Sequence, residues 1–197
     1  DVGREYAKLT GSASTAIKFL EFIRTNKLRE SHLVYKCGKP LIQRSSSSLG
    51  NQIWTALEQV AVASLDVGDL EFAEECYNKL LKQFTKTPRV LRLRALCLEA
   101  VGDLDRARSI YEALVLKDPT DQESMKRQIA ICLQKGNTAQ AIEKLNQYLS
   151  VFMSDVDAWR TLGDIYIKQQ KFTYALHCYE MLILAEPNNH RLYNQLA

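Results

Sequence analysis

A small residue recurs at a fixed interval along most of the chain. Ala73, Ala107, Ala141 and Ala175 are each separated by 34 residues. Large side chains follow every alanine at intervals of four and seven, and these spacings place them on one face of a helix. They are Tyr77 and Leu80, Tyr111 and Leu114, Leu145 and Tyr148, and Tyr179 and Leu182. A period of this length predicts an array of similar structural units.

Each unit is expected to be a pair of antiparallel helices. Five residues before the first three alanines lie the turn dipeptides Gly68-Asp69, Gly102-Asp103 and Gly136-Asn137, and the fourth unit has Gln170-Lys171 instead. Such dipeptides turn the chain between two helices. The alanine then lets the second helix approach the first closely. One helix pair cannot bury its apolar face alone, so several pairs must stack.

The last complete unit, residues 156–189, resembles the tetratricopeptide repeat (TPR) family in detail. Seven of its residues fit the family spacing, namely Trp159, Leu162, Gly163, Tyr166, Ala175, Tyr179 and Pro187. The resemblance implies an all-α fold, a TPR superhelical solenoid, with repeats at 54–87, 88–121, 122–155 and 156–189. Residues 190–197 resemble the start of a fifth repeat. Because the chain begins with Asp1 and ends within this pattern, we expect it to be a segment of a longer protein.

The first 53 residues do not follow the 34-residue register. We expect them to form a non-repeat helical N-terminal cap and a serine-rich linker before a TPR array at 54–197. Helical spacing predicts one helix at 14–26 and a second at 31–43, which Gly38 and Pro40 should weaken or end. The run Ser45–Ser48 is typical of a linker.

Two helix starts are also predicted within the array. Thr87 precedes Pro88, which matches a helix N-cap followed by a proline in the first turn. Thr120 and Glu123 have the spacing of a capping box.

The composition offers little support for catalysis, metal binding or nucleic-acid binding. The net charge is only +3, and no apolar run approaches the roughly 18 residues of a membrane-spanning helix. The three histidines lack partners at metal-ligand spacings, and no phosphate-binding or nucleophile motif occurs. We therefore expect a protein that is not an enzyme and has no cofactor or metal. The five cysteines are expected to be reduced, buried thiols: Cys37, Cys76, Cys97, Cys132 and Cys178.

In the TPR family, the first helix of each pair lines an inner groove. The corresponding positions of this chain, with their neighbours, carry six basic residues that we take as candidate protein-binding residues: Arg89, Arg92, Lys126, Arg127, Arg160 and Lys168. One hypothesis is a basic groove for an acidic or extended peptide. The alternative is an ordinary solvated face, on which scattered charge is the rule.

Two specialised kinds of helical-repeat protein fit less well. TPR co-chaperones grip an acidic peptide tail with a lysine and an asparagine in the first repeat, where this chain has Glu58 and Val62. Glu58 would repel a carboxylate. Helical-repeat RNA binders normally have a more basic face than this chain provides.

Local sequence narrows the resemblance to one TPR family. Several segments resemble subunit 2 of the ER membrane protein complex, and the likeness extends over roughly residues 14 to 197. The segments are 51–60, 63–68, 118–121, 126–131, 141–149, 157–159 and 185–190. The Asn-Gln-Tyr-Leu stretch at 146–149 and the Asn-Asn-His ending at 188–190 are more specific than TPR spacing.

This resemblance implies a non-catalytic scaffold on the cytosolic face of the ER membrane. That family's complex inserts transmembrane and tail-anchored proteins, and its subunit 2 is attached to the membrane indirectly, through partners. The implied partners are cytosolic subunit 8 or 9 and the cytosolic parts of subunits 3 and 5. The alternative is a free-standing TPR adaptor or co-chaperone that binds a peptide ligand in its groove.

Overall fold

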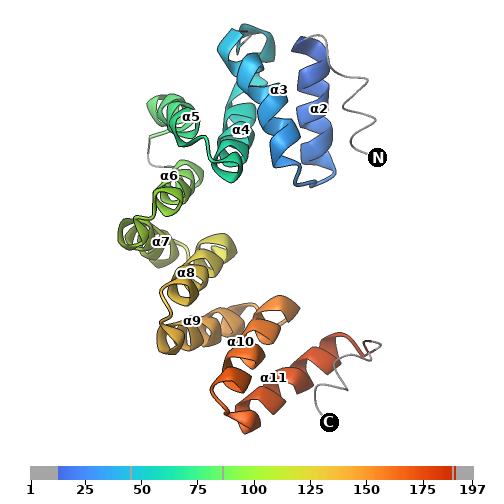
Figure 1. Cartoon of the computed structure of the whole chain (residues 1–197), viewed down its shortest axis with the longest axis vertical. Helices are drawn as coiled ribbons and strands as arrows, with labels where there is room; N and C mark the ends of the chain where they lie inside the picture. The colour runs from blue at the N-terminus through green and yellow to red at the C-terminus, as the bar shows by residue number, and fades with distance from the viewer. Residues whose placement is uncertain (1–12, 45, 86, 188, 190–197) are drawn as a thin grey trace. The chain divides into compact units, whose positions relative to one another are not determined.

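The computed structural model describes residues 13–44, 46–85, 87–187 and 189. Throughout these residues the regular structure is helical, with ten α-helices and one 3₁₀ helix (Figure 1). The all-α prediction is therefore confirmed. The chain forms two compact units, Asp1–Ile110 (unit 1) and Tyr111–Ala197 (unit 2). The partial fifth repeat at 190–197 lies outside the described residues.

Unit 1 begins with two helices that precede the repeats, α2 (Ala13–Thr25) and α3 (Ser31–Arg44). We expected Gly38 and Pro40 to weaken or end the second helix, but α3 continues through both. A helix-interior proline removes one backbone hydrogen bond, and burial beyond it compensates, since Leu41 and Ile42 are both core residues. Gly38 packs directly on Val60 of the next helix, where a Cβ atom would lie 2.2 Å from Val60 Cγ2.

The serine-rich segment is more ordered than the linker that its composition predicts. A 3₁₀ helix, η1 (Ser46–Gln52), leads directly into α4 (Ile53–Val67). Leu49 anchors η1 because its side chain is buried in the core of unit 1. Gly50 has φ 48° and ψ −130°, a conformation that glycine tolerates far better than other residues.

The remaining helices of unit 1 are α5 (Leu70–Gln83), α6 (Pro88–Val101) and the first part of α7 (Leu104–Lys117). In unit 1, α4 packs against α3, α5 and α6. One continuous core joins α2 and α3 to these repeat helices, with Phe19 and Leu20 from the front segment and Leu57 and Phe72 from the first repeat.

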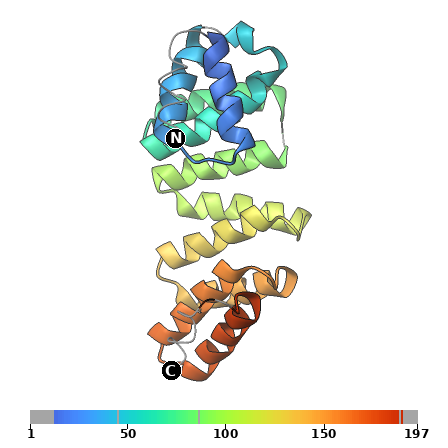
Figure 2. The same ribbon diagram turned by 90° about the vertical axis from the view of Figure 1, so that its right-hand side faces the viewer.

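Unit 2 contains the end of α7 and four further helices. These are α8 (Gln122–Gln134), α9 (Thr138–Val151), α10 (Val156–Lys168) and α11 (Phe172–Ala185). Consecutive helices from α8 to α11 pack on one another, as the yellow to red ribbons of Figure 2 show. Gly163 of α10 lies against Tyr179 of α11, and a Cβ atom added at Gly163 would lie 3.3 Å from the tyrosine ring.

The repeat landmarks have the expected roles. Ala73, Ala107 and Ala141 are completely buried and Ala175 is 4% exposed. The backbone is in the left-handed region at Gly68, Gly102 and Gly136, with φ of 91°, 92° and 71°. The fourth turn uses Gln170 in the same backbone region, at φ 58°. The predicted turns between paired helices are confirmed.

The two predicted helix starts have different outcomes. Thr87 occupies the N-cap position before Pro88, but its side chain makes no capping bond. The capping box of Thr120 and Glu123 is wrong, because the N-cap is Asp121, whose carboxylate accepts a hydrogen bond from Ser124 N–H. The Thr120 hydroxyl instead donates to Asp118 Oδ1 at 2.6 Å.

The five cysteines are free thiols, as expected. Cys76, Cys132 and Cys178 are buried, and Cys37 and Cys97 are partly buried. Burial raises the pKa of Cys76 to about 12 and that of Cys178 to about 11. A thiol needs to ionise to act as a nucleophile or a metal ligand, so these side chains act as apolar core residues.

Candidate protein-binding surfaces

The six candidate basic residues lie on first helices of the repeats. Unit 1 has Arg89 and Arg92 on α6, and unit 2 has the other four on α8 and α10. Four of the six are exposed and two, Arg92 and Arg127, are half-buried. Nothing in the structure assigns a partner protein to any of them, so their role in binding stays a prediction.

At least three of the six form ion pairs within the chain. Arg89 of α6 contacts Glu58 of α4, with 3.1 Å between its Nη2 and the Glu58 Oε2. Arg160 lies 3.5 Å from Asp157 and 3.9 Å from Glu186. The third residue with an ion pair inside the chain is Lys126, which contacts Asp155. Their positive charge is therefore partly balanced by nearby carboxylates.

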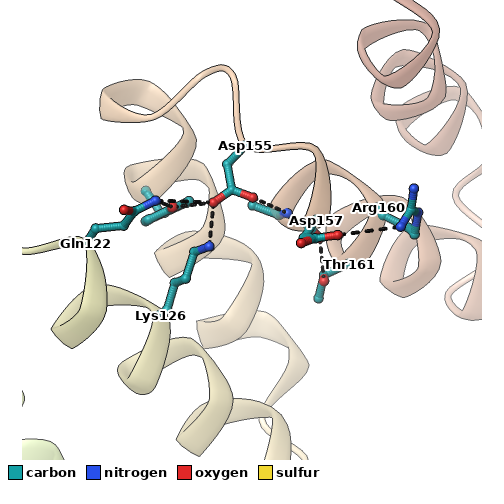
Figure 3. A network of polar contacts seen from close by, with 8 residues as sticks. Gln122, Lys126, Asp155, Asp157, Arg160 and Thr161 are labelled. Atoms are coloured by element: carbon teal, nitrogen blue, oxygen red, sulfur yellow. Dashed lines mark hydrogen bonds and ion pairs between the residues drawn. The ribbon is translucent and has the colours of Figure 1, made fainter. Parts of the chain in front are cut away.

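Lys126 belongs to a polar network that joins three helices of unit 2 (Figure 3). Its ammonium lies 2.6 Å from Asp155 Oδ2. The Tyr148 hydroxyl of α9 donates to the same oxygen at 2.5 Å and accepts a hydrogen bond from Gln122 at 2.7 Å. Asp155 Oδ1 accepts from Ala158 N–H and so caps α10. One carboxylate thus fixes the start of α10 against α8 and α9.

A similar network occurs in unit 1. Asp69 caps α5 by accepting from Phe72 N–H with Oδ1. Its other oxygen accepts hydrogen bonds from the Tyr35 hydroxyl at 2.6 Å and from Lys39 at 2.5 Å. Both networks therefore combine an N-cap aspartate with a tyrosine and a lysine from neighbouring helices.

The two capping aspartates are strongly acidic. Hydrogen bonds from Lys39 and Tyr35 lower the pKa of Asp69 to about 2. Burial favours a higher pKa for Asp155, but hydrogen bonds from Lys126, Tyr148 and Ala158 N–H outweigh it and lower the pKa to about 2. Both carboxylates are therefore fully charged near neutral pH.

Unit 1 has a pocket of about 170 Å³ that is lined by α4, α5 and α6. Apolar side chains form most of its wall, and the Glu58–Arg89 ion pair also lines it. Trp54 and Phe84 meet edge to face, with ring centroids 5.3 Å apart. The lining residues are Trp54, Thr55, Glu58, Leu80, Phe84, Thr87, Arg89, Val90 and Leu93.

Sequence reasoning from charge found Arg89 but missed this pocket. Two aromatic residues could have indicated the pocket from sequence, because Trp54 begins the first repeat and Phe84 follows the second helix of that repeat.

Among the described residues, no group of three or more potential ligands could hold a metal ion. Within that same part of the chain, every helix is too short or too polar to cross a bilayer.

Comparison with known proteins identifies the family. A sequence model of the family described as "EMC2 TPR-like repeat domain" matches residues 84–197, more than half of the chain. The chain belongs to this family. Relatives that match most of the chain are named ER membrane protein complex subunit 2, so the predicted resemblance is confirmed.

Individual relatives agree with the family match. The chain is 40% identical over 174 residues to ER membrane protein complex subunit 2 of Xenopus tropicalis. It is 39% identical over 176 residues to the subunit of the same name from Dictyostelium discoideum. Each alignment includes 88% of this chain, but only 59% and 55% of those relatives. The chain therefore spans little more than half the length of the curated relatives it matches.

Solved structures support the fold. A TPR protein of Thermus thermophilus superposes with a TM-score of 0.63 at 13% identity, covering 94% of this chain and 97% of that one. A tetratricopeptide repeat protein of Parabacteroides merdae gives 0.60 at 18% identity, covering 98% and 71%. At these identities the likeness shows the TPR fold alone.

Proposed function

We propose that the chain is a non-catalytic protein-binding scaffold that serves as the cytosolic TPR subunit of the ER membrane protein complex. In this role it supports the insertion of transmembrane and tail-anchored proteins into the ER membrane. The observation that carries the proposal is the family match together with about 40% identity to named subunits over most of the chain. Stacked TPR helix pairs suit such a role, since they present long surfaces for partner proteins.

The proposed partners are cytosolic subunit 8 or 9 and the cytosolic parts of subunits 3 and 5. The chain would reach the ER membrane indirectly, through these proteins. Affinity purification of the tagged protein from intact cells, after gentle detergent extraction, tests this. Recovery of integral ER membrane subunits supports the scaffold, and recovery of heat-shock proteins alone supports the free-standing adaptor instead.

The six basic residues remain candidates for contacting these partners. Lys126 also pairs with Asp155 inside unit 2, so its substitution would mix folding with binding. Lys168 is exposed at the last turn of α10 and gives a cleaner test. Lys168→Glu should weaken recovery of partners if this surface binds them, while Lys144→Glu on α9 should not. Equal recovery with both variants at moderate salt would favour the ordinary solvated face.

A further inference from the structure

The pocket of unit 1 has the size and the wall of a site for one large apolar side chain. Its volume is about 170 Å³, and an apolar cavity of about 150 Å³ is known to hold a benzene molecule. Trp54 and Phe84 supply flat aromatic surface, and Val90 and Leu93 of α6 supply aliphatic surface. A phenyl ring therefore matches both the space and the chemistry.

The Glu58–Arg89 ion pair indicates which chemical group of the partner should lie next to that ring. The Arg89 side chain is 66% exposed although Glu58 lies 3.1 Å away. A guanidinium has five N–H donors, so Arg89 can bind a second carboxylate while it keeps Glu58. Glu58 and Arg89 both line the pocket and offset each other's charge. The remaining N–H donors of Arg89, and not a net positive charge, therefore favour a carboxylate at this point.

We propose that this pocket binds a partner protein through a phenylalanine-sized apolar side chain with a carboxylate close to it in sequence. The ring enters between α4 and α6, and the carboxylate accepts hydrogen bonds from Arg89. The apolar contact in the pocket and the hydrogen-bonded contact with Arg89 lie at a fixed separation, and together they determine which segment of the partner can bind. This inference rests on the proposed function and identifies one anchoring point for a partner of the scaffold.

Site-directed photocrosslinking tests the proposal in the full chain inside cells. Benzoylphenylalanine replaces Gln52, which is exposed and immediately precedes α4. Mass spectrometry then identifies the crosslinked segment, and the same sample reports whether integral ER membrane subunits were recovered. The expected segment carries a phenylalanine or similarly large apolar residue with an aspartate or glutamate nearby.

Matched variants separate the pocket from the rest of the surface. Thr55→Phe fills the pocket and should reduce the crosslink roughly tenfold or more, the scale of a lost interface anchor. Asn78→Phe adds the same ring on the exposed side of α5 and should leave it unchanged. Arg89→Gln should also reduce the crosslink, whereas Arg94→Gln on the same helix should not.

Three kinds of result would overturn the proposed binding in the pocket, and one of them would also overturn the proposed function. A crosslink to lipid, to a segment without an apolar anchor and acid, or one indifferent to Thr55→Phe overturns the proposal. Intact recovery of the membrane subunits without a pocket crosslink overturns it while the proposed function stands. Failure to recover those subunits removes both.

Discussion

The ammonium of Lys126 on α8 lies 2.6 Å from the carboxylate of Asp155, which caps the start of α10. A residue selected from sequence as a candidate binding cation is thus also part of the internal framework of unit 2. The Lys126 side chain is 47% exposed but the Asp155 side chain only 12%, so the carboxylate of the pair is better shielded from solvent than that of an ordinary surface ion pair.

Removing the lysine should destabilise unit 2. We expect Lys126→Gln to lower the free energy of unfolding by roughly 1–2 kcal/mol, because it removes a charge-assisted hydrogen bond to a mostly buried carboxylate. Urea denaturation measures the loss. Lys168→Gln is the control, since this exposed position should change stability by less than about 0.5 kcal/mol. Equal stability of the two variants would refute the structural role of Lys126.

The capping aspartates predict a loss of stability in acid. The folded-state pKa of Asp155 is about 2, below the roughly 3.9 of an unfolded chain. Its stabilising contribution is therefore complete above the unfolded value and is lost as pH falls from about 5 towards 2, for a total of roughly 2 kcal/mol. Asp155→Asn should flatten this part of the stability profile, which urea titrations at several pH values measure. An unchanged acid slope in Asp155→Asn would show that its charge does not contribute.

The contact between Gly38 and Val60 predicts an unusual response to alanine. In most helix interiors, glycine to alanine stabilises by about 1 kcal/mol. At Gly38 the new Cβ would lie 2.2 Å from Val60 Cγ2, so Gly38→Ala should destabilise by roughly 1–3 kcal/mol through overpacking. Adding Val60→Ala should recover part of this loss in a double-mutant cycle. A more stable Gly38→Ala protein would mean that α3 and α4 do not pack this closely.

The fourth turn should become more stable if Gln170 is replaced by glycine, the residue at the equivalent position of the other three turns. Gln170 has φ 58°, a left-handed conformation that a side chain disfavours by roughly 1 kcal/mol. Gln170→Gly should therefore raise the thermal midpoint, and the reciprocal Gly136→Gln should lower it. Differential scanning calorimetry checks both. If the two substitutions shift the midpoint in the same direction, backbone conformation is not what governs these turns.

The repeat landmarks were predictable because they depend on local chemistry. A left-handed glycine such as Gly102 and a small buried residue such as Ala107 act within one helix pair, so the 34-residue spacing reveals them. The continuation of α3 past Pro40 was not predictable, since it depends on burying Leu41 and Ile42 against other helices. The Lys126–Asp155 pair likewise joins residues on different helices.

The difference between features within one helix pair and contacts between helices also applies to the six candidate basic residues. Sequence reasoning selected cations by their position within each repeat, but it had no means of pairing Arg89 with Glu58 of the preceding repeat. The pocket beside that pair needs side chains from three helices. Asp121 was overlooked as an N-cap because Thr120 offered a familiar capping pattern one residue earlier.

The amount of this protein in the purified ER membrane complex tests the central claim most directly. Quantitative mass spectrometry of the detergent-extracted complex, isolated through one of its integral membrane subunits, measures that ratio. A scaffold subunit predicts a ratio close to one copy per integral subunit, retained through washes at moderate salt. A ratio far below one, or loss of the protein in the first washes, would contradict the assignment.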